Sequence, residues 1–414
     1  MIENTCIACS QCDLLIKLRP PEAGNRALCP RCDNLLTANH PNAINRVIVF
    51  SFTALLFLFL SNIFPFLSIY AQGLEQSVTL LQSILILVNQ DFITLAILIF
   101  ITVILIPGIY LICALYICLS IKSAQLLPST SILMKLIIHL KQWNMAEIFL
   151  IGILVSFIKI VSLADISLGL SFWAYIMFIL SMTLVMLNID KYQFWQWINT
   201  KQNIVMQPLA PIPTPEQIQE SAYGSCSVCE SFVLSTSESC NCCGAHQHKR
   251  INNSVQKTWA LIITALLLYV PANVLPIMRM KYLGVESSNT IVGGVIALWQ
   301  HGSYPIALII FIASVLVPIG KIIALSWLCY KVQRGNNQFC KQKTILYRGT
   351  ELIGRWSMID VFVVVILVAL IRAGDVMSVY PGLGAIAFSG LVVVTIMAAI
   401  SFDPRLIWDN GACR

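Results

Sequence analysis

Long apolar runs separated by polar loops constrain this chain more than any other feature. A membrane-spanning helix needs about 20 predominantly apolar residues. By that criterion we expect eight spans, at residues 47–69, 93–119, 146–163, 169–189, 258–278, 304–330, 357–373 and 381–401. The composition agrees, because only 11% of the residues are charged, against about 25% in soluble proteins. The expected fold class is therefore an all-α polytopic membrane protein.

Two further apolar segments, 77–89 and 290–299, are too short to cross a bilayer at the rise of an α-helix. Gly293 and Gly294 also interrupt the second of them. We expect both segments to lie at the membrane interface or outside it, where they cap the helical bundle.

Basic residues gather on one side of this topology. The termini and the loops on their side carry 21 of the 26 Lys and Arg residues, whereas the opposite loops carry Arg279 and Lys281. Loops rich in Lys and Arg remain in the cytoplasm. The bias predicts that both termini and the long central loop are cytoplasmic, and it accounts for the net charge of +7 without a nucleic-acid partner.

The sequence repeats itself at a nearly constant offset of 211 to 213 residues. Matching pairs include Cys29 with Cys240, Asn62 with Asn273, Pro107 with Pro318 and Trp143 with Trp356. We therefore expect two tandem modules, each a cysteine-rich zinc ribbon followed by about four spans that enter the membrane in the same sense. The expected division is a ribbon at 1–46, a membrane module at 47–200, a Pro-rich linker at 201–222, a second ribbon at 223–250 and a second membrane module at 251–414.

Paired C-x2-C turns suggest two zinc sites, because each turn directs two thiolates toward one tetrahedral ion. The expected ligands are Cys9, Cys12, Cys29 and Cys32 in the first ribbon, and Cys226, Cys229, Cys240 and Cys243 in the second. Domains this small need a metal to supply folding free energy, and a reducing cytoplasm disfavours disulfides. We expect two structural Zn²⁺ ions, with a redox switch as the competing interpretation.

Spare side chains leave part of the ligand assignment open. Cys6 lies at the same spacing before Cys9, Cys242 adjoins Cys243, and His246 or His248 can substitute for one cysteine. Neither ribbon carries the dense basic and aromatic face that nucleic-acid binding requires. We interpret both as structural or protein-docking modules.

A few ionisable and hydroxyl groups lie inside the expected spans, where burial of a charge is costly and functional sites are common. Lys321 is the clearest, with Ser314 seven residues earlier on the same helix face. Candidate partners in the last two spans are Ser357, Asp360 and Thr395. Such a set can bind an anionic headgroup or relay a proton. Alternatively, the lysine extends to the interface and Asp360 only caps a helix.

Asn-x2-Pro recurs at the outer end of the first span of each module. The residues are Asn62 with Pro65, and Asn273 with Pro276. Proline frees a backbone carbonyl that the asparagine can satisfy, so a shared kink or helix end is one interpretation. A hinge, or the lip of a lipid-accessible groove, is the other.

Motifs for nucleotide hydrolysis or zinc-dependent proteolysis are absent, as is a nucleophile elbow. We therefore do not expect this chain to be an enzyme.

Several longer stretches resemble the paraquat-inducible protein A (PqiA) family of Gram-negative inner-membrane proteins. They are CSQCDLL from Cys9, CPRC from Cys29, LSNIFPF around Asn62, WNMAEIFLIGILVSFIK from Trp143, YVPANVLPIM around Asn273, GRWSMIDVFV from Gly354 and FDPRLIWD near the end. These stretches cover nearly the whole chain. The additional Cys6 and Cys242 depart from the pattern.

The resemblance implies an inner-membrane partner of a periplasmic MCE-domain protein, whose stacked rings form a tunnel that carries lipid between the two membranes. The expected function is an inner-membrane subunit that passes phospholipid between the inner membrane and this tunnel. The alternative is a membrane stress sensor whose ribbons respond to zinc or oxidants.

Overall fold

The computed structural model describes most of the chain. The described residues are 5–18, 21–22, 24–71, 74–123, 125–161, 165–202, 223–226, 228–234, 238–240, 242–246, 250–282, 285–300, 302, 304–335, 339–370, 372–373 and 377–409. The expected linker at 201–222 lies almost entirely outside them.

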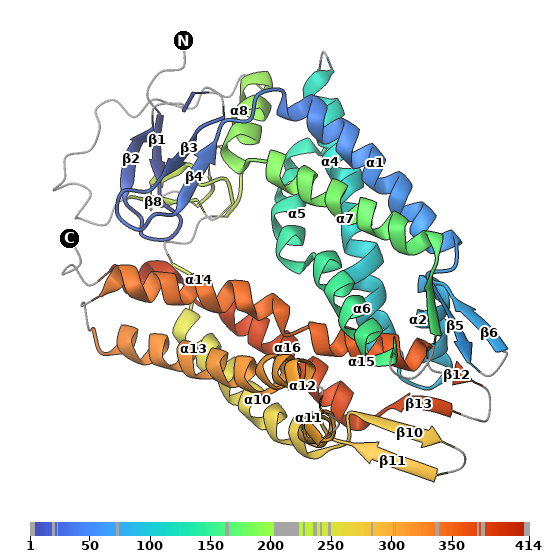
Figure 1. Cartoon of the computed structure of the whole chain (residues 1–414). Coiled ribbons are helices and arrows are strands. Elements are labelled where there is room, and N and C mark those ends of the chain that lie inside the picture. The colour runs from blue at the N-terminus through green and yellow to red at the C-terminus, as the bar shows by residue number, and fades with distance from the viewer. Residues whose placement is uncertain are drawn as a thin grey trace.

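Short antiparallel hairpins form the cysteine-rich regions. Their strands are β1 (Thr5–Ala8), β2 (Leu15–Leu18), β3 (Arg26–Leu28) and β4 (Leu35–Ala38), then β8 (Tyr223–Ser225) and β9 (Phe232–Leu234). Figure 1 shows them gathered at one end of the molecule, which we call the ribbon end. Segments about 190 residues apart in the sequence therefore lie together.

The first helical half follows in chain order. Its elements are α1 (Ala43–Ile63), β5 (Leu67–Ala71), β6 (Leu74–Val78), α2 (Leu80–Asn89), α3 (Ile93–Ile99), the π-helical turn η1 (Phe100–Leu105), α4 (Ile106–Lys122), α5 (Thr130–Trp143), α6 (Ala146–Val161), β7 (Asp165–Leu168), α7 (Leu170–Asn188) and α8 (Lys191–Lys201).

The second half repeats this order. Its elements are α10 (Ser254–Val274), β10 (Met278–Tyr282), β11 (Val285–Asn289), α11 (Ile291–Gln300), α12 (Tyr304–Phe311), the π-helical turn η2 (Ile312–Leu316), α13 (Val317–Gln333), α14 (Cys340–Trp356), α15 (Ile359–Leu370), β12 (Arg372–Ala373), β13 (Met377–Pro381), α16 (Leu383–Ser401) and the 3-10 turn η3 (Pro404–Ile407).

Seven helical stretches within the described residues are long and apolar enough to cross a membrane. Six of them correspond to expected spans, whereas the seventh, Thr130–Phe157, joins α5 to the expected span at 146–163. The eighth expected span, 357–373, corresponds to α15. Its 12 residues extend about 18 Å, which is less than the hydrocarbon thickness of about 30 Å. The preceding helix α14 is too rich in cations to extend it as an apolar span.

The two short apolar segments form α2 and α11, ten residues each. Thr79 caps α2 in a capping box with Gln82, and Thr290 Oγ1 accepts a hydrogen bond from Gly293 N at the start of α11. Each helix is about 15 Å long, as expected for segments that do not span. Their position relative to the membrane stays a prediction.

Two small sheets were not expected from the sequence. A three-stranded sheet in the order β6-β5-β7 and a four-stranded sheet in the order β11-β10-β13-β12 lie at the end opposite the ribbons, which we call the sheet end (Figure 1). All their strand pairs are antiparallel; Leu67 of β5, for example, lies between Val78 and Leu168. Because β5 and β10 continue the apolar runs of α1 and α10, the sequence analysis wrongly extended the first and fifth spans into them.

Two glycines bring each half back from its sheet to its last long helix. A Cβ on Gly169 would lie 2.0 Å from the carbonyl oxygen of Pro65, and one on Gly382 would lie 2.0 Å from that of Pro276. Only glycine permits this approach. It positions α7 against α1 and α16 against α10, the two largest helix contacts.

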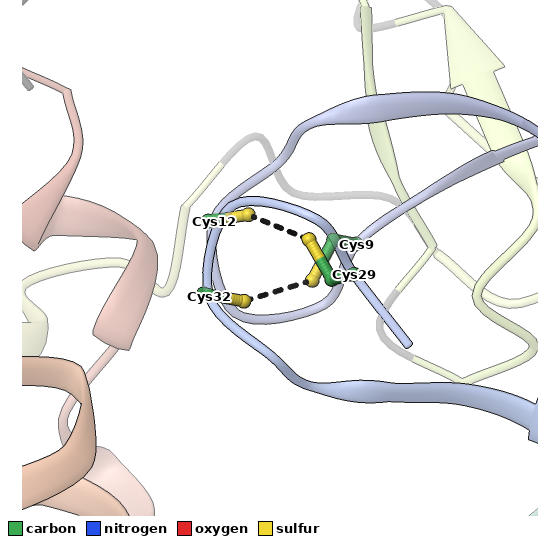
Figure 2. Close-up of side chains that lie close together, drawn as sticks. All are labelled: Cys9, Cys12, Cys29 and Cys32. Carbon is green, nitrogen blue, oxygen red and sulfur yellow. Dashed lines mark hydrogen bonds between the residues drawn. The ribbon is translucent and has the colours of Figure 1, made fainter. Parts of the chain in front are cut away.

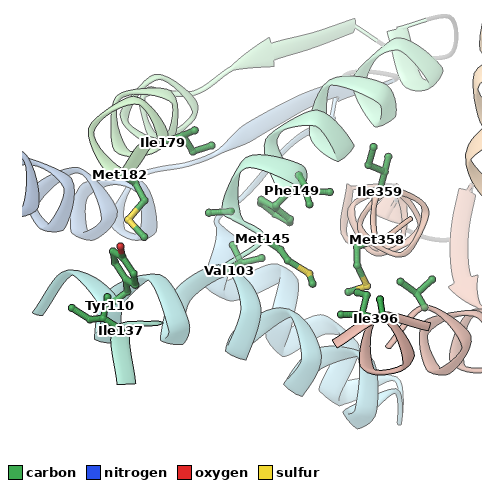
Figure 3. Packing of buried hydrophobic residues seen from close by; sticks show 14 of the residues in the cluster. Val103, Tyr110, Ile137, Met145, Phe149, Ile179, Met182, Met358, Ile359 and Ile396 are labelled. Atoms are coloured by element: carbon green, nitrogen blue, oxygen red, sulfur yellow. The ribbon is translucent and has the colours of Figure 1, made fainter. Parts of the chain in front are cut away.

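The two halves meet where α6 packs against α15. A Cβ on Gly152 would lie 3.0 Å from Phe362 Cβ, and the rings of Phe149 and Phe362 meet edge to face with centroids 5.4 Å apart. Figure 3 shows Phe149 of α6 turned toward Ile359 of α15. Small residues permit such close helix contacts in membranes.

Replacing Gly152 with leucine should therefore force the two halves apart. We expect Gly152→Leu to destabilise the protein by about 1–3 kcal/mol, the usual range for overpacking a tight interface. Gly349→Leu is the matched control, because a Cβ at this helical glycine meets nothing within 4 Å. Thermal unfolding in detergent measures both. Equal melting temperatures for the two variants would contradict this description of the interface.

Candidate metal centres and intramembrane polar site

The first cysteine cluster is built from two turns of the same shape. Cys9 N donates to Leu14 O and Asp13 N donates to Cys9 O; the turn at Cys29 repeats both bonds, through Asn34 and Asp33. Asp13 and Asp33 adopt left-handed backbone angles, which aspartate tolerates better than most residues. The sequence therefore shapes each turn so that its two sulfurs point to the same side.

All four expected ligands of the first ribbon come together (Figure 2). Cys9 Sγ lies 3.6 Å from Cys32 Sγ, and Cys12 Sγ lies 3.6 Å from Cys29 Sγ. Four sulfurs bound at about 2.3 Å to a tetrahedral zinc ion lie about 3.8 Å apart. The four buried cysteines therefore fit one Zn²⁺ ion.

The second cluster has the same geometry. Cys226 pairs with Cys243 and Cys229 with Cys240, each at 3.6 Å between sulfurs, and all four side chains are buried. Gly244 occupies the left-handed position after the second C-x2-C turn. These four residues also fit one metal ion.

The spare candidates lie elsewhere where the structure describes them. Cys242 Sγ accepts a hydrogen bond from Asn199 Nδ2 at 3.0 Å, and His246 is exposed and belongs to neither cluster. The side chain of Cys6 and all of His248 lie outside the described residues. Within the described part of the chain, each cluster thus consists of cysteines alone.

Each ribbon also contacts the opposite helical half, an arrangement that the sequence analysis did not foresee. Arg250 pairs with Asp13 of the first ribbon and with Asp409 at the C-terminal end. In the first ribbon, the Arg31 guanidinium lies 4.4 Å from the ring centre of Trp408. These contacts bring the first ribbon to the end of the second half.

The metal clusters themselves take part in this crossed docking. Arg348 of α14 donates to Cys32 Sγ at 3.5 Å. Conversely, Glu230 of the second ribbon pairs with Lys191 of α8 at 3.2 Å, beside the bond from Asn199 to Cys242. Only the repeated Asp-x4-Trp pattern at 190 and 403 hinted at a role for these ends.

Asp403 anchors the ribbon end of the second half. It accepts hydrogen bonds from Arg405 Nε at 2.9 Å and from Ile251 N at 3.2 Å. Burial opposes its ionisation, but the hydrogen bonds and charge of Arg405 outweigh that effect and hold the pKa of Asp403 below its ordinary value. Its stabilising contribution is therefore present above the ordinary aspartate pKa and is lost as the pH falls through the lowered one.

The expected intramembrane residues converge in the second half. Lys321 of α13 is 2% exposed, and its Nζ donates to Thr395 Oγ1 of α16 at 2.8 Å. Gly354 O and Ser357 Oγ, at the C-terminal end of α14, each lie 3.4 Å from the same nitrogen. The negative end of the α14 dipole also favours the ammonium group there.

A second polar contact joins the two remaining candidates. Ser314 Oγ donates to Asp360 Oδ2 at 2.5 Å, and both residues are buried. Ser314 lies in the π-helical turn η2, a rare form that often marks functional sites. The structure thus brings all five candidates into two hydrogen-bonded sets on neighbouring helices.

The first half has the same helices but not the same chemistry. At the positions of Ser314, Lys321 and Thr395 it carries Val103, Tyr110 and Met182, all buried. Within the described residues the Tyr110 hydroxyl has no hydrogen-bond partner, and Figure 3 shows it directed at Met182. The polar site therefore belongs to the second half.

The four hinge or groove candidates lie at the helix-to-sheet junctions. Asn62 Nδ2 donates to Leu58 O at 2.7 Å, and Asn273 Nδ2 donates to Tyr269 O at 2.9 Å. The helices end at Ile63 and Val274, just before Pro65 and Pro276. This arrangement favours the helix-end interpretation, and a hinge or groove role stays a prediction.

The ligand assignment of the second ribbon can be tested with two serine variants. We expect Cys226→Ser to lower the zinc content from two ions per chain to one, because three thiolates no longer close a tetrahedral site. Cys242→Ser should retain both ions. Elemental analysis of the purified proteins measures the difference, and zinc loss in Cys242→Ser alone would reverse the assignment.

The sequence was compared with known proteins. The family model for paraquat-inducible protein A matches residues 44–199 and again 255–411. The intermembrane transport protein PqiA of Escherichia coli K12 is 38% identical over 405 residues, which cover 98% of this chain and 95% of that protein.

More distant relatives also align over nearly the full length. The lipophilic envelope-spanning tunnel protein A of Escherichia coli K12 is 27% identical, covering 97% of this chain and 90% of the relative. A probable intermembrane transport protein of Haemophilus influenzae is 26% identical, covering 97% and 95%. No solved structure matches. The family model and the relative at 38% identity together show that this chain belongs to the paraquat-inducible protein A family.

Proposed function

We propose that this chain is the inner-membrane subunit of an intermembrane phospholipid transport system. In this proposal it passes lipid between the inner membrane and a periplasmic tunnel formed by an MCE-domain protein. The names of the relatives support transport: two are described as intermembrane transport proteins and one as a lipophilic envelope-spanning tunnel protein. None of these names describes an enzyme.

The distribution of basic residues supports an orientation for this subunit. The ribbon end, with both termini, faces the cytoplasm, and the two small sheets face the periplasm. The partner tunnel then meets the sheet end, while the ribbons hold structural zinc and stabilise the cytoplasmic end. The crossed contacts of the ribbons support such a structural role, because each one ties the two halves together.

The buried cluster around Lys321 carries the proposal for the membrane domain. A charged ammonium 2% exposed among apolar helices is costly unless acceptors surround it, and such groups usually mark substrate or ion pathways. Here a hydroxyl at 2.8 Å and a helix-terminal carbonyl at 3.4 Å hold it in place. We assign Lys321 to headgroup contact or ion coupling, with Thr395 and Ser357 positioning it and Ser314 positioning Asp360.

Replacing the lysine tests this assignment. We expect Lys321→Ala to lower transport by about tenfold or more, as loss of a charge-assisted hydrogen bond permits, without lowering the amount of protein in the membrane. The assay is outer-membrane integrity in cells that depend on this chain for lipid transport, with immunoblotting to measure its level.

Tyr110→Phe is the matched control, because it changes the equivalent position of the first half and removes a hydroxyl without a partner in the described structure. It should behave as wild type. Full activity of Lys321→Ala at a normal protein level would rule out the proposed role of the cluster.

A further inference from the structure

A cavity of about 300 Å³ lies between the two halves, on the ribbon side of the Lys321 cluster. Its polar lining comes from Gln142 of α5 and from Glu351 and Arg355 of α14. Its apolar wall comes from α16, through Ile396, Ala399 and Ile400. The volume is at the small end of the range for ligand pockets, which suits a headgroup better than a whole lipid.

Two opposite charges line this cavity one helical turn apart. Glu351 and Arg355 are separated by about 6 Å along α14. In the part of the chain that the structure describes, neither side chain makes an ion pair or a hydrogen bond. Partly buried charges of this kind gain most from a ligand that supplies both opposite charges.

The cavity adjoins the buried lysine directly. Gly354 lines the cavity, and its carbonyl oxygen lies 3.4 Å from Lys321 Nζ. A Cβ at Gly354 would lie 3.9 Å from Lys321 Cε and Nζ, so this glycine is a thin wall between the two sites. A ligand in the cavity therefore lies next to the polar cluster without reaching it.

We propose that this cavity binds the headgroup of a zwitterionic aminophospholipid. Arg355 binds the phosphate and Glu351 binds the ammonium group, while the glycerol end lies along the apolar wall of α16. A phosphoethanolamine group has two carbons between its ester oxygen and its nitrogen, so side chains one turn apart can contact both charges. This inference rests on the proposed transport function and adds a substrate class and a binding site to it.

The repeat explains why only one such site is built. The positions equivalent to Arg355 and Glu351 in the first half are Gln142 and Ile138, which carry no charge. Gln142 faces the same cavity. The headgroup is therefore recognised by the half that also holds Lys321.

The test measures lipid binding to the purified full-length chain with its zinc sites filled. Native mass spectrometry in detergent compares phosphatidylethanolamine with phosphatidylglycerol of the same acyl chains. Wild type should prefer phosphatidylethanolamine. Glu351→Gln should weaken binding of phosphatidylethanolamine about tenfold and leave phosphatidylglycerol unchanged, whereas Arg355→Gln should weaken both about tenfold, the scale of one lost charge-assisted hydrogen bond.

Controls separate the site from general effects. Lys257→Gln removes an exposed charge of α10 and should bind as wild type. If Arg355→Gln loses zinc or aggregates, Ile400→Trp replaces it, because the indole fills the cavity from the wall and should weaken both lipids.

The outcomes distinguish this site from the transport function itself. Wild-type lipid preference in Glu351→Gln, together with wild-type binding in the cavity variants, would overturn the site while leaving transport intact. A wild-type chain that binds neither lipid would overturn both. Binding of soluble phosphoethanolamine as tight as that of the lipid would overturn the assignment to a membrane lipid.

Discussion

Burial of the Lys321 ammonium within an apolar bundle is the interaction on which the rest of the second half depends. In the hydrocarbon region no bulk water can solvate a charge, so the protein must supply every partner. Those partners come from different helices: Thr395 from α16, and Gly354 O from the end of α14. Satisfying one charge therefore fixes three helices relative to one another. The break between α14 and α15 follows, because a continuous helix would not present its terminal carbonyl to the lysine.

Duplication explains how one half can carry this chemistry while the other supports it. Both halves use the same glycine junction, at Gly169 and Gly382, to return from sheet to helix. Both also have a π-helical turn at the same place. The first half has replaced the charged positions with apolar or aromatic residues, so its bundle is stabilised by packing alone. The α6–α15 interface and the crossed ribbons join the two halves, and the cavity lies between these contacts.

Much of this could be predicted from the sequence. Cysteine spacing predicted which thiols meet, because a C-x2-C turn has little conformational choice, and hydropathy located most of the spans. The sheets were missed because β5 and β10 are five residues long and continue apolar runs. Contacts between distant segments, such as Arg348 with Cys32, have no local signal. The same limit applies to the cavity, since neither Glu351 nor Arg355 is distinguished by sequence from any other surface pair on an amphipathic helix.

The central claim is that this chain handles phospholipid together with a periplasmic tunnel protein. It is tested most directly by expressing the chain with an MCE-domain partner, purifying the chain in mild detergent and identifying the bound protein and lipid by mass spectrometry. The account predicts that the partner co-purifies and that phospholipid remains bound. A well-folded, zinc-loaded chain that retains neither partner nor phospholipid would contradict it.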